Sequence, residues 1–328
     1  MNIAIDMMGG DFAPAEAVKG VQLFLSEHGV STPDHSSLPS RSSAPGLILI
    51  GDEARINPLL VQHGIDGKSV NVVHAPEVIG MNEHPTKALK EKQRSSISVG
   101  FQLLASGKTD AFISAGNTGA MLVGALYSIK PLEGVLRPTI STIIPKDNGA
   151  QGLLLDVGLN ADCKPEHLNQ FALLGSMYTQ YISGIENPRV GLLNLGEEEG
   201  KGNLLAQAAY TLLKENKDIH FVGNIEGRDI LKDKADVMVC DGFTGNIILK
   251  MAESIYEITR SKSIHHDYLD QFNFEIYGGT PVLGVSSPVI IGHGISHGKA
   301  FANMIRLAVK MIDADLMKKM KSRLEKIQ

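Results

Sequence analysis

The sequence predicts an α/β fold: a largely parallel sheet flanked by helices. Short apolar runs typical of buried strands recur along the 328 residues. Nearly every run ends in a turn of glycine and polar residues, and most turns lead directly into a segment with helical spacing of apolar residues. Strands and helices that alternate in this way form a parallel sheet covered on both faces, and ligands bind at the carboxyl edge of such a sheet.

The individual elements follow from these runs. The expected strands are 3–6, 47–50, 70–74, 111–113, 140–144, 152–155, 190–195, 219–222, 237–240 and 289–291. Helices are expected at 16–27, from Pro85, at 121–129, from Pro165, around 204–213, and as one long amphipathic C-terminal helix. Residues 31–46 are rich in Ser and Pro without periodicity, which predicts a mobile loop. The length allows one large domain or two smaller ones, and we expect a single domain over 1–328.

Composition excludes several classes of protein. A content of 43% hydrophobic and 20% charged residues is ordinary for a soluble globular chain. The formal net charge of −5 gives no support to a nucleic-acid partner. Two cysteines, Cys163 and Cys240, make no disulfide framework, which favours a reducing, cytoplasmic setting. No apolar run approaches the roughly 18 residues of a membrane-spanning helix, so we do not expect one.

The turn after the strand 111–113 is the first candidate binding segment. Gly116, Asn117, Thr118 and Gly119 stand between this strand and a helix, whose first free N–H groups and positive dipole end point into the turn. Such a turn can hold an anion. An ordinary strand–helix connection has the same appearance as a single turn of this kind. The recurrence of such turns along the chain is what favours anion binding.

Three lysines, Lys164, Lys201 and Lys299, stand at helix starts, where a cation opposes the helix dipole at a cost of about 0.3–1 kcal/mol. Their recurrence at one edge of the sheet favours a negatively charged ligand, although each side chain can also turn into water. Further polar residues are expected at the same edge, and together they can line one cleft: Asn117, Asn160, Asn194, Asn246 and His293.

Known phosphate and metal motifs do not account for these turns. Gly200-Lys201 resembles a P-loop, but Leu195 stands where its first glycine should be, and Gly202 replaces the metal-binding Ser or Thr. No Gly-x-Gly-x-x-Gly follows a strand, so the dinucleotide signature is also missing. His293 and His297 are four residues apart without the glutamate of a zinc motif.

Cys163 beside Lys164 leaves an acyl-cysteine intermediate open, because a neighbouring cation lowers the pKa of a thiol. No histidine stands at a readable spacing to act as its base, which disfavours covalent catalysis.

With these residues in view, the chain resembles the acyl-ACP:phosphate acyltransferase (PlsX) family of bacterial phospholipid synthesis. The resemblance covers nearly the whole chain and rests on eight motifs in one order: 6–11 (DMMGGD), 74–80 (HAPEVIG), 114–120 (SAGNTGA), 156–168 (DVGLNADCKPEHL), 186–202 (ENPRVGLLNLGEEEGKG), 223–229 (GNIEGRD), 241–250 (DGFTGNIILK) and 277–284 (YGGTPVLG). It implies a fold related to isocitrate and isopropylmalate dehydrogenases and to phosphotransacetylase.

The resemblance also implies an activity: acyl transfer from acyl-ACP to inorganic phosphate, which gives acyl phosphate for glycerol-3-phosphate acylation. It implies a homodimer, no metal or nucleotide cofactor, and the downstream glycerol-3-phosphate acyltransferase as a further partner.

Holding phosphate against a thioester carbonyl is mostly a positioning problem, and the candidate residues suit it. Gly116, Asn117, Thr118 and Gly119 can hold phosphate or the developing oxyanion. Lys164 and Lys201 can neutralise phosphate and the departing thiolate. Asn160 and Asn194 can orient the carbonyl, and His293 is a candidate for proton transfer.

Acyl carrier protein is acidic, so the family role requires a basic docking patch. The best local cluster is Lys87, Lys90, Lys92 and Arg94, on the expected exposed face of the helix that begins at Pro85. A solvated helix face has the same appearance.

Between Lys250 and Tyr277 the family usually carries a longer apolar helical hairpin. Residues 251–276 are a shortened helical excursion with several charged residues, so membrane contact is expected to be peripheral at most and binding to liposomes weak or absent.

Two other readings stay open. A nicotinamide-dependent decarboxylating dehydrogenase would need metal-binding carboxylates and an arginine cluster, which the sequence does not offer. A non-catalytic scaffold that binds phosphate or acyl groups would bind them without releasing the thiol.

Overall fold

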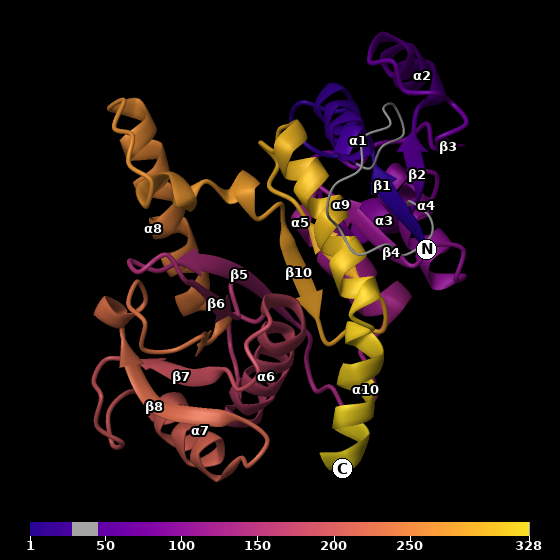
Figure 1. Ribbon diagram of the computed structural model, residues 1–328. Coiled ribbons are helices and arrows are strands. Elements are labelled where there is room, and N and C mark those ends of the chain that lie inside the picture. The colour runs from indigo at the N-terminus through magenta and orange to yellow at the C-terminus, as the bar shows by residue number, and fades with distance from the viewer. Residues whose placement is uncertain (28–44, 328) are drawn as a thin grey trace. The chain divides into compact units, whose positions relative to one another are not determined.

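The computed structural model describes residues 1–27 and 45–327 (Figure 1). The chain divides into two compact units, each assembled from separate stretches of sequence. Unit 1 comprises Met1–Lys130, Glu275–Gly279 and Val285–Asp313, and unit 2 comprises Pro131–Phe274, Thr280–Gly284 and Ala314–Gln328. Most of the predicted loop 31–46 lies outside the described residues, but the prediction was wrong at its end, because Gly46 is already the first residue of a strand.

Unit 1 is a parallel sheet with helices. Its described strands run in the order β3-β2-β1-β4-β11, and every pair is parallel. They are β1 (Asn2–Asp6), β2 (Gly46–Gly51), β3 (Val70–His74), β4 (Ala111–Ser114) and β11 (Val289–Ile291). The helices are α1 (Ala15–Glu27), α2 (Glu53–Gln62), α3 (Pro85–Glu91), α4 (Ser96–Ala105), α5 (Thr118–Gly124) and α9 (Gly298–Asp313). Residues 3–6 of β1 are buried throughout, as expected of a strand covered on both faces.

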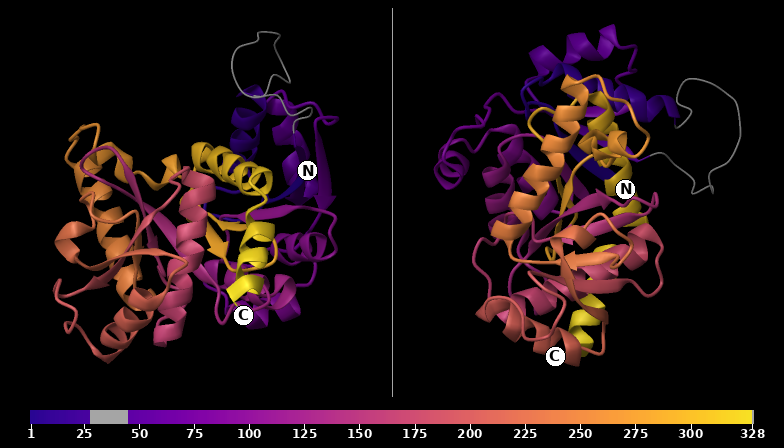
Figure 2. Two further views of the ribbon diagram at one scale, coloured as in Figure 1. Left: turned by 60° about the horizontal axis from the view of Figure 1, so that its bottom comes forward. Right: turned by 90° about the vertical axis from the view of Figure 1, so that its left-hand side faces the viewer.

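Close backbone contacts fix two helices of unit 1. α1 and α9 lie side by side (Figures 1 and 2), and a Cβ added to Gly20 would stand 2.3 Å from the Cβ of Phe301. A Cβ on Gly100 of α4 would stand 2.3 Å from the ring of Phe112 in β4. Glycine is therefore required at both positions for the helices to approach their neighbours.

The strands of unit 2 run in the order β10-β5-β6-β9-β7-β8. Its strands are β5 (Thr139–Pro145), β6 (Gln151–Leu155), β7 (Arg189–Asn194), β8 (His220–Glu226), β9 (Val237–Val239) and β10 (Thr280–Leu283). β5 is antiparallel to both of its neighbours, whereas the pairs from β6 to β8 are parallel. The helices are α6 (Pro165–Tyr178), α7 (Leu204–Glu215), α8 (Gly242–Ser261) and α10 (Leu316–Ile327). The predicted α/β class with a largely parallel sheet is confirmed.

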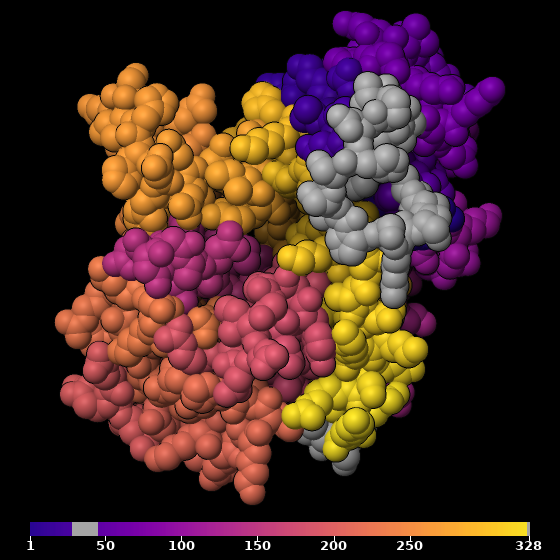
Figure 3. All heavy atoms as spheres, viewed as in Figure 1, coloured from indigo at the N-terminus to yellow at the C-terminus, as the bar shows by residue number. Residues whose placement is uncertain are grey.

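α8 is long and only sparsely buried. Of its 20 residues only Gly242, Gly245 and Thr259 are buried. Its end and the turn that follows, residues 260–267, are exposed, orange at upper left in Figure 3. The segment predicted as a helical excursion, 251–276, is the second half of α8 followed by short 3-10 turns. No helix in the described part of the chain is long and apolar enough to cross a membrane.

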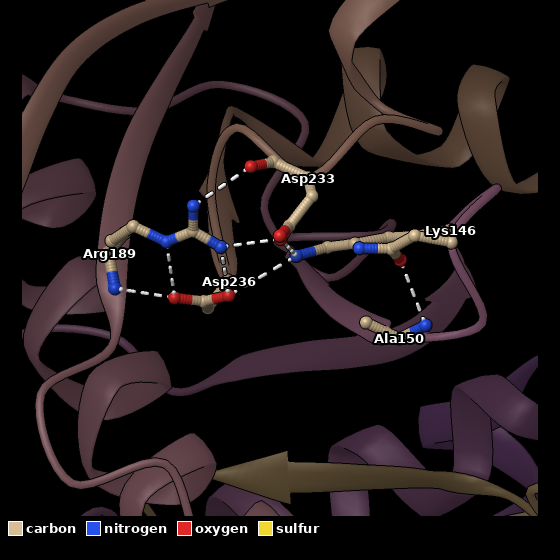
Figure 4. Close-up of polar contacts among 6 residues, drawn as sticks. Lys146, Ala150, Arg189, Asp233 and Asp236 are labelled. Carbon is tan, nitrogen blue, oxygen red and sulfur yellow. Dashed lines mark hydrogen bonds and ion pairs between the residues drawn. The ribbon is translucent and has the colours of Figure 1, made fainter.

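An ion network with a buried centre joins the carboxyl end of β5 to the amino ends of β7 and β9 in unit 2 (Figure 4). The ammonium group of Lys146, which is 0% exposed, lies 3.0 Å from Asp233 Oδ1 and 3.2 Å from Asp236 Oδ1. Arg189 donates through Nε and Nη2 to the two carboxylate oxygens of Asp236 at 2.9 and 2.8 Å. Burial alone would raise the pKa of Asp236, but hydrogen bonds from Arg189 and Lys146 outweigh it and hold this pKa well below its usual value.

The structure adds elements that the sequence pattern did not predict. These are α2, α4 and β10. The predicted long C-terminal helix is in fact two helices, because the chain breaks at Asp315, whose φ of 49° is left-handed. The strand predicted to end at 222 continues as β8 to Glu226.

Candidate active site

A buried carboxyl group shapes the loop that carries Lys164 in unit 2. Asp156 follows β6, and its Oδ1 accepts a hydrogen bond from Ile140 N at 3.0 Å. Its Oδ2 accepts from Asn160 N at 2.5 Å and from Asn160 Nδ2 at 3.0 Å. Burial raises the pKa of Asp156, while these hydrogen bonds oppose the increase. The loop between Asp156 and Asn160 is therefore closed around one side chain.

Asn160 ties this loop to its surroundings. Its amide nitrogen also donates to Pro138 O at 2.8 Å, and its backbone carbonyl accepts from Gly242 N at 2.8 Å. Both amide hydrogens of this buried side chain are therefore engaged within unit 2. These contacts position the loop, and the predicted orientation of a substrate carbonyl by Asn160 stays a prediction.

Lys164 occupies the cap position of α6, as the sequence indicated. Its backbone N–H donates to His167 Nδ1 at 3.0 Å, and its exposed side chain forms no ion pair with any described residue. Burial lowers the pKa of His167, and the charges of Arg137 and Lys164 lower it further. The cations Arg137 and Lys164 thus both act on the start of α6, and the nearby Glu166 opposes them.

Cys163 is poorly suited to act as a nucleophile. Burial, with the nearby charge of Asp156, raises the pKa of its thiol to about 11. The thiol is therefore protonated at neutral pH, in contrast to the lowered pKa that the acyl-cysteine alternative needs.

Two asparagine side chains hold the turn after β7. Asn194 Nδ2 donates to Lys201 O and to Asn224 Oδ1, each at 3.1 Å, and Asn194 Oδ1 accepts from Leu195 N at 2.8 Å. Asn224, 3% exposed, donates to Glu198 O at 2.9 Å. Sequence reasoning missed Asn224 because it placed this residue in a turn, whereas it lies inside β8.

The acidic turn leaves Lys201 without a carboxylate partner. Glu197 pairs with Lys234 at 2.7 Å and Glu199 pairs with Lys214 at 2.8 Å. Lys201 is exposed and has no ion pair with any described residue. Two of the three glutamates are therefore neutralised by other lysines, which reduces their repulsion of an anion beside Lys201.

A cleft of about 390 Å³ opens in unit 2 beside Asn194. Its walls come from the carboxyl ends of β7 and β9 and from the starts of α7 and α8. The predicted residues Asn160, Lys164, Asn194 and Lys201 thus belong to loops of one unit at the carboxyl edge of its sheet.

The predicted glycine turn lies in unit 1 and caps α5. The Asn117 amide donates to the carbonyl oxygens of Gly80, Met81 and Glu83 at 2.9, 3.1 and 3.0 Å, and Gly116 N donates to Ser114 Oγ at 2.9 Å. Asn117 Oδ1 accepts from Ala120 N at 2.9 Å. These groups are occupied structurally, which leaves the N–H groups of Thr118 and Gly119 as the donors that no described residue occupies.

His293 also belongs to unit 1. It follows β11, which pairs with β4, and the neighbouring Gly292 N donates to Ser114 O at 2.8 Å. The half-buried ring of His293 therefore lies on the loop next to the glycine turn. The structure places Asn117 and His293 in unit 1, and it places the two lysines in unit 2.

The predicted docking cluster is only partly on a helix face. α3 ends at Glu91, so Lys92 and Arg94 lie beyond it. Lys92 is tied down by Glu83 at 2.5 Å and Val78 O at 2.8 Å, which corrects its assignment to a free basic face. Lys87, Lys90 and Arg94 are exposed, and their side chains form no ion pair with any described residue.

Residues 1–27 and 45–327 contain no group of three or more His, Cys, Asp or Glu side chains that could hold a metal ion.

Comparisons with known proteins agree with these features. The sequence profile of a family described as "Fatty acid synthesis protein" matches residues 1–270 and 258–319. The chain is 40% identical to a phosphate acyltransferase of Dictyoglomus turgidum over 346 residues, covering 100% of this chain and 98% of the relative. It is 42% identical to a phosphate acyltransferase of Endomicrobium trichonymphae, covering 93% and 92%.

Solved structures show the same fold. A phosphotransacetylase from Streptococcus pyogenes aligns with a TM-score of 0.65 at 17% identity, covering 97% of this chain and 94% of that one. A 4-hydroxythreonine-4-phosphate dehydrogenase from Klebsiella pneumoniae aligns with a TM-score of 0.53 at 13% identity, covering 94% and 97%. The expected likeness to phosphotransacetylases and dehydrogenases is confirmed.

Proposed function

Because the chain belongs to the fatty acid synthesis protein family, we propose that it is an acyltransferase that moves a fatty acyl group from acyl-ACP to inorganic phosphate. In this reaction a phosphate oxygen forms a bond to the thioester carbonyl carbon. The carbon–sulfur bond breaks, and the thiolate of the carrier protein leaves and takes up a proton. The products are acyl phosphate, for phospholipid synthesis, and free carrier protein.

One observation supports a catalytic role for unit 2. Lys164 and Lys201, which have no carboxylate partner among the described residues, stand on loops that hydrogen bonds hold in place. Lys164 follows the loop closed around Asp156, and Lys201 ends the turn held by Asn194 and Asn224. Reactants held in place, with cations fixed before charge develops, account for most of the rate enhancement in reactions of this kind. Lys164 and Lys201 are therefore assigned to neutralise phosphate and the leaving thiolate. Asn194, whose amide hydrogens go to Lys201 O and Asn224 Oδ1, is assigned to brace the turn that carries Lys201.

Unit 1 is assigned two further roles. The N–H groups of Thr118 and Gly119, at the start of α5, are proposed as phosphate donors, and Gly116 and Asn117 as the residues that shape their turn. His293 is proposed as the group that handles the proton. Lys87, Lys90 and Arg94 are proposed to dock the acidic carrier protein.

The test is thiol release from purified acyl-ACP with and without inorganic phosphate. Lys164→Ala and Lys201→Ala should each lower kcat/KM by about 10²-fold, as removal of a preorganised electrostatic group does. Lys217→Ala, an exposed lysine at the opposite edge near β8, is the matched control. Normal turnover with unchanged phosphate dependence in both lysine variants would contradict the assignment.

We also propose that the protein acts in the cytoplasm as a homodimer, touches the membrane at most peripherally, and delivers acyl phosphate to the glycerol-3-phosphate acyltransferase. An apolar face on α8 supports the homodimer. Phe243, Ile247, Met251 and Ile258 lie on one side of this helix and are 52–66% exposed. A second copy of the chain would remove this face from water.

A further inference from the structure

We propose that the cleft beside Asn194 binds the fatty acyl chain of the donor substrate, an assignment that rests on the proposed function. The cleft of about 390 Å³ lies near the lower end of the usual range for ligand pockets, roughly 300–1,000 Å³. Most of its wall is aliphatic. The side chains that matter here are Leu168, Leu193, Leu205, Ala206, Ile230 and Ile248.

Most polar side-chain groups in the wall already have partners in the protein. Asn194 is engaged at both ends of its amide by Lys201, Asn224 and Leu195. Asn203 Oδ1 accepts from Ala206 N at 2.8 Å, and the two oxygens of Asp241 accept from Thr244 N and Oγ1 at 2.9 Å each. A ligand in this cleft therefore meets satisfied polar groups and bare hydrocarbon, which suits an aliphatic chain.

The rim of the cleft includes exposed apolar surface. Leu195 lines the cleft and is 73% exposed. An entering alkyl chain would cover this side chain and remove it from water.

The cleft is bounded by the loops that carry the two lysines. Leu168 lies one helical turn after Lys164, and its N–H donates to the Lys164 carbonyl at 3.4 Å. Asn194 Nδ2 is bonded to the carbonyl of Lys201 at 3.1 Å. An acyl chain in the cleft therefore has its thioester end near loops that can neutralise phosphate and thiolate.

The first experiment uses the absence of tryptophan from the natural chain. Leu195→Trp places a single reporter at the rim, and Leu136→Trp places one at another exposed leucine of unit 2 as the control. Sodium dodecanoate below its micelle concentration should cause a saturable blue shift in the Leu195→Trp protein alone. No shift in that protein, or the same shift in both, would overturn the proposal.

The second experiment fills the cleft. In the Leu195→Trp protein, Ala206→Phe adds a ring in the cleft, and Ala208→Phe adds the same ring on the exposed side of α7. Each buried methylene is worth about fourfold in affinity, so dodecanoate affinity should fall at least about tenfold with Ala206→Phe and stay unchanged with Ala208→Phe. Equal affinities in two folded variants would overturn the proposal.

Activity separates this inference from the function on which it rests. Without the reporter, Ala206→Phe should lower the ratio of kcat/KM for hexadecanoyl-ACP to that for butyryl-ACP by about tenfold. An unchanged ratio would overturn the assignment of the cleft. If the natural protein releases no thiol with phosphate but dodecanoate binding still depends on residue 206, the proposed function fails and the fatty acyl site stands.

Discussion

The charged side chains of unit 2 differ in whether they already have a partner within the protein. Glu197 and Glu199 pair with Lys234 and Lys214, and Lys201 is left exposed. At the other edge of unit 2 the carboxylate of Asp236 is buried and pairs with the buried Lys146 and the half-buried Arg189. The same residue types are therefore paired at one edge, where they contribute to stability, and partly unpaired at the other, where binding is proposed.

The buried network predicts how stability depends on pH. The pKa of Asp236 is held below its unfolded value of about 3.9, so the stabilisation is present above that pH and is lost as the pH falls through the lower folded-state value. Lys146→Met should lower the free energy of unfolding by about 3 kcal/mol at pH 7 and weaken this acid dependence.

Urea unfolding between pH 2 and 7 measures both effects. The control is Lys232→Met, which removes an exposed pair with Asp147 and should cost less than about 1 kcal/mol. Equal losses in the two variants would show that burial of the network adds nothing.

The phosphate assignment in unit 1 rests on backbone N–H groups and can be tested at one residue. Thr118 is the first residue of α5, where proline is well tolerated, and Thr118→Pro removes both the N–H and the hydroxyl. Thr118→Pro should raise the KM for phosphate about tenfold without lowering the melting temperature. Thr118→Val, which keeps the N–H and loses the hydroxyl, should leave this KM unchanged, and similar constants in both variants would refute the role of the N–H.

Strands with a clear apolar run were the easiest elements to predict. Short elements and elements that contain glycine were the hardest. β3 agrees with the prediction residue for residue, because its apolar run is bounded by polar turns. β10 was missed because Pro281 and the preceding glycines read as a turn. α4 was missed because it has no charged face and contains Gly100. Glycine is needed there because the ring of Phe112 leaves no room for a side chain. This is a tertiary contact, which the local sequence pattern does not reveal.

The candidate site, like the fold, could be predicted where it depends on local sequence pattern but not where it depends on tertiary contacts. Lys164 breaks a local rule visible in the sequence, because it stands at the cap of α6. The same prediction was wrong for Lys201, because α7 begins later and Asn203 caps it, although both lysines are exposed. The hydrogen bonds that occupy the amides of Asn117 and Asn160 join segments far apart in the chain. No spacing rule could reveal that these side chains are already in use.

α3 carries the prediction for carrier docking. Lys87→Glu, Lys90→Glu and Arg94→Glu together should raise the KM for acyl-ACP about tenfold or more at low salt, with little change for phosphate, because charge steers association. The same reversals at Lys318, Lys321 and Lys326 of α10 provide the control. A KM for acyl-ACP equal to that of the control would rule out docking at α3.

α8 carries the prediction for assembly. Ile247→Lys with Met251→Lys should convert the dimer to a monomer, because each lysine interrupts the apolar face. Light scattering after size exclusion measures the mass, and Glu257→Lys on the same helix is the control. A natural protein that is already a monomer, or a double variant that stays dimeric, would refute this interface.

At the scale of the whole molecule, the chain passes between its two units after Lys130, Phe274, Gly279, Gly284 and Asp313. We propose on this ground that residues 1–328 act as one domain, since neither unit is a continuous stretch of sequence. Calorimetry should show one unfolding transition, with a calorimetric enthalpy equal to the van't Hoff value. Two separate transitions would mean that the units unfold independently.

The packing of α8 has a consequence for which substitutions the protein can accept. A methyl group on Gly245 would stand 1.9 Å from the carbonyl oxygen of Asp156, and one on Gly242 would stand 2.7 Å from that of Asn160. Tolerance along this helix must therefore be uneven: the fold of one subunit admits no side chain at either glycine of the opening turn, whereas apolar replacements on the outward side farther along leave that fold unchanged. A substitution near the end of α8 alters a surface, whereas one in its first turn alters the shape of the loop that carries Lys164.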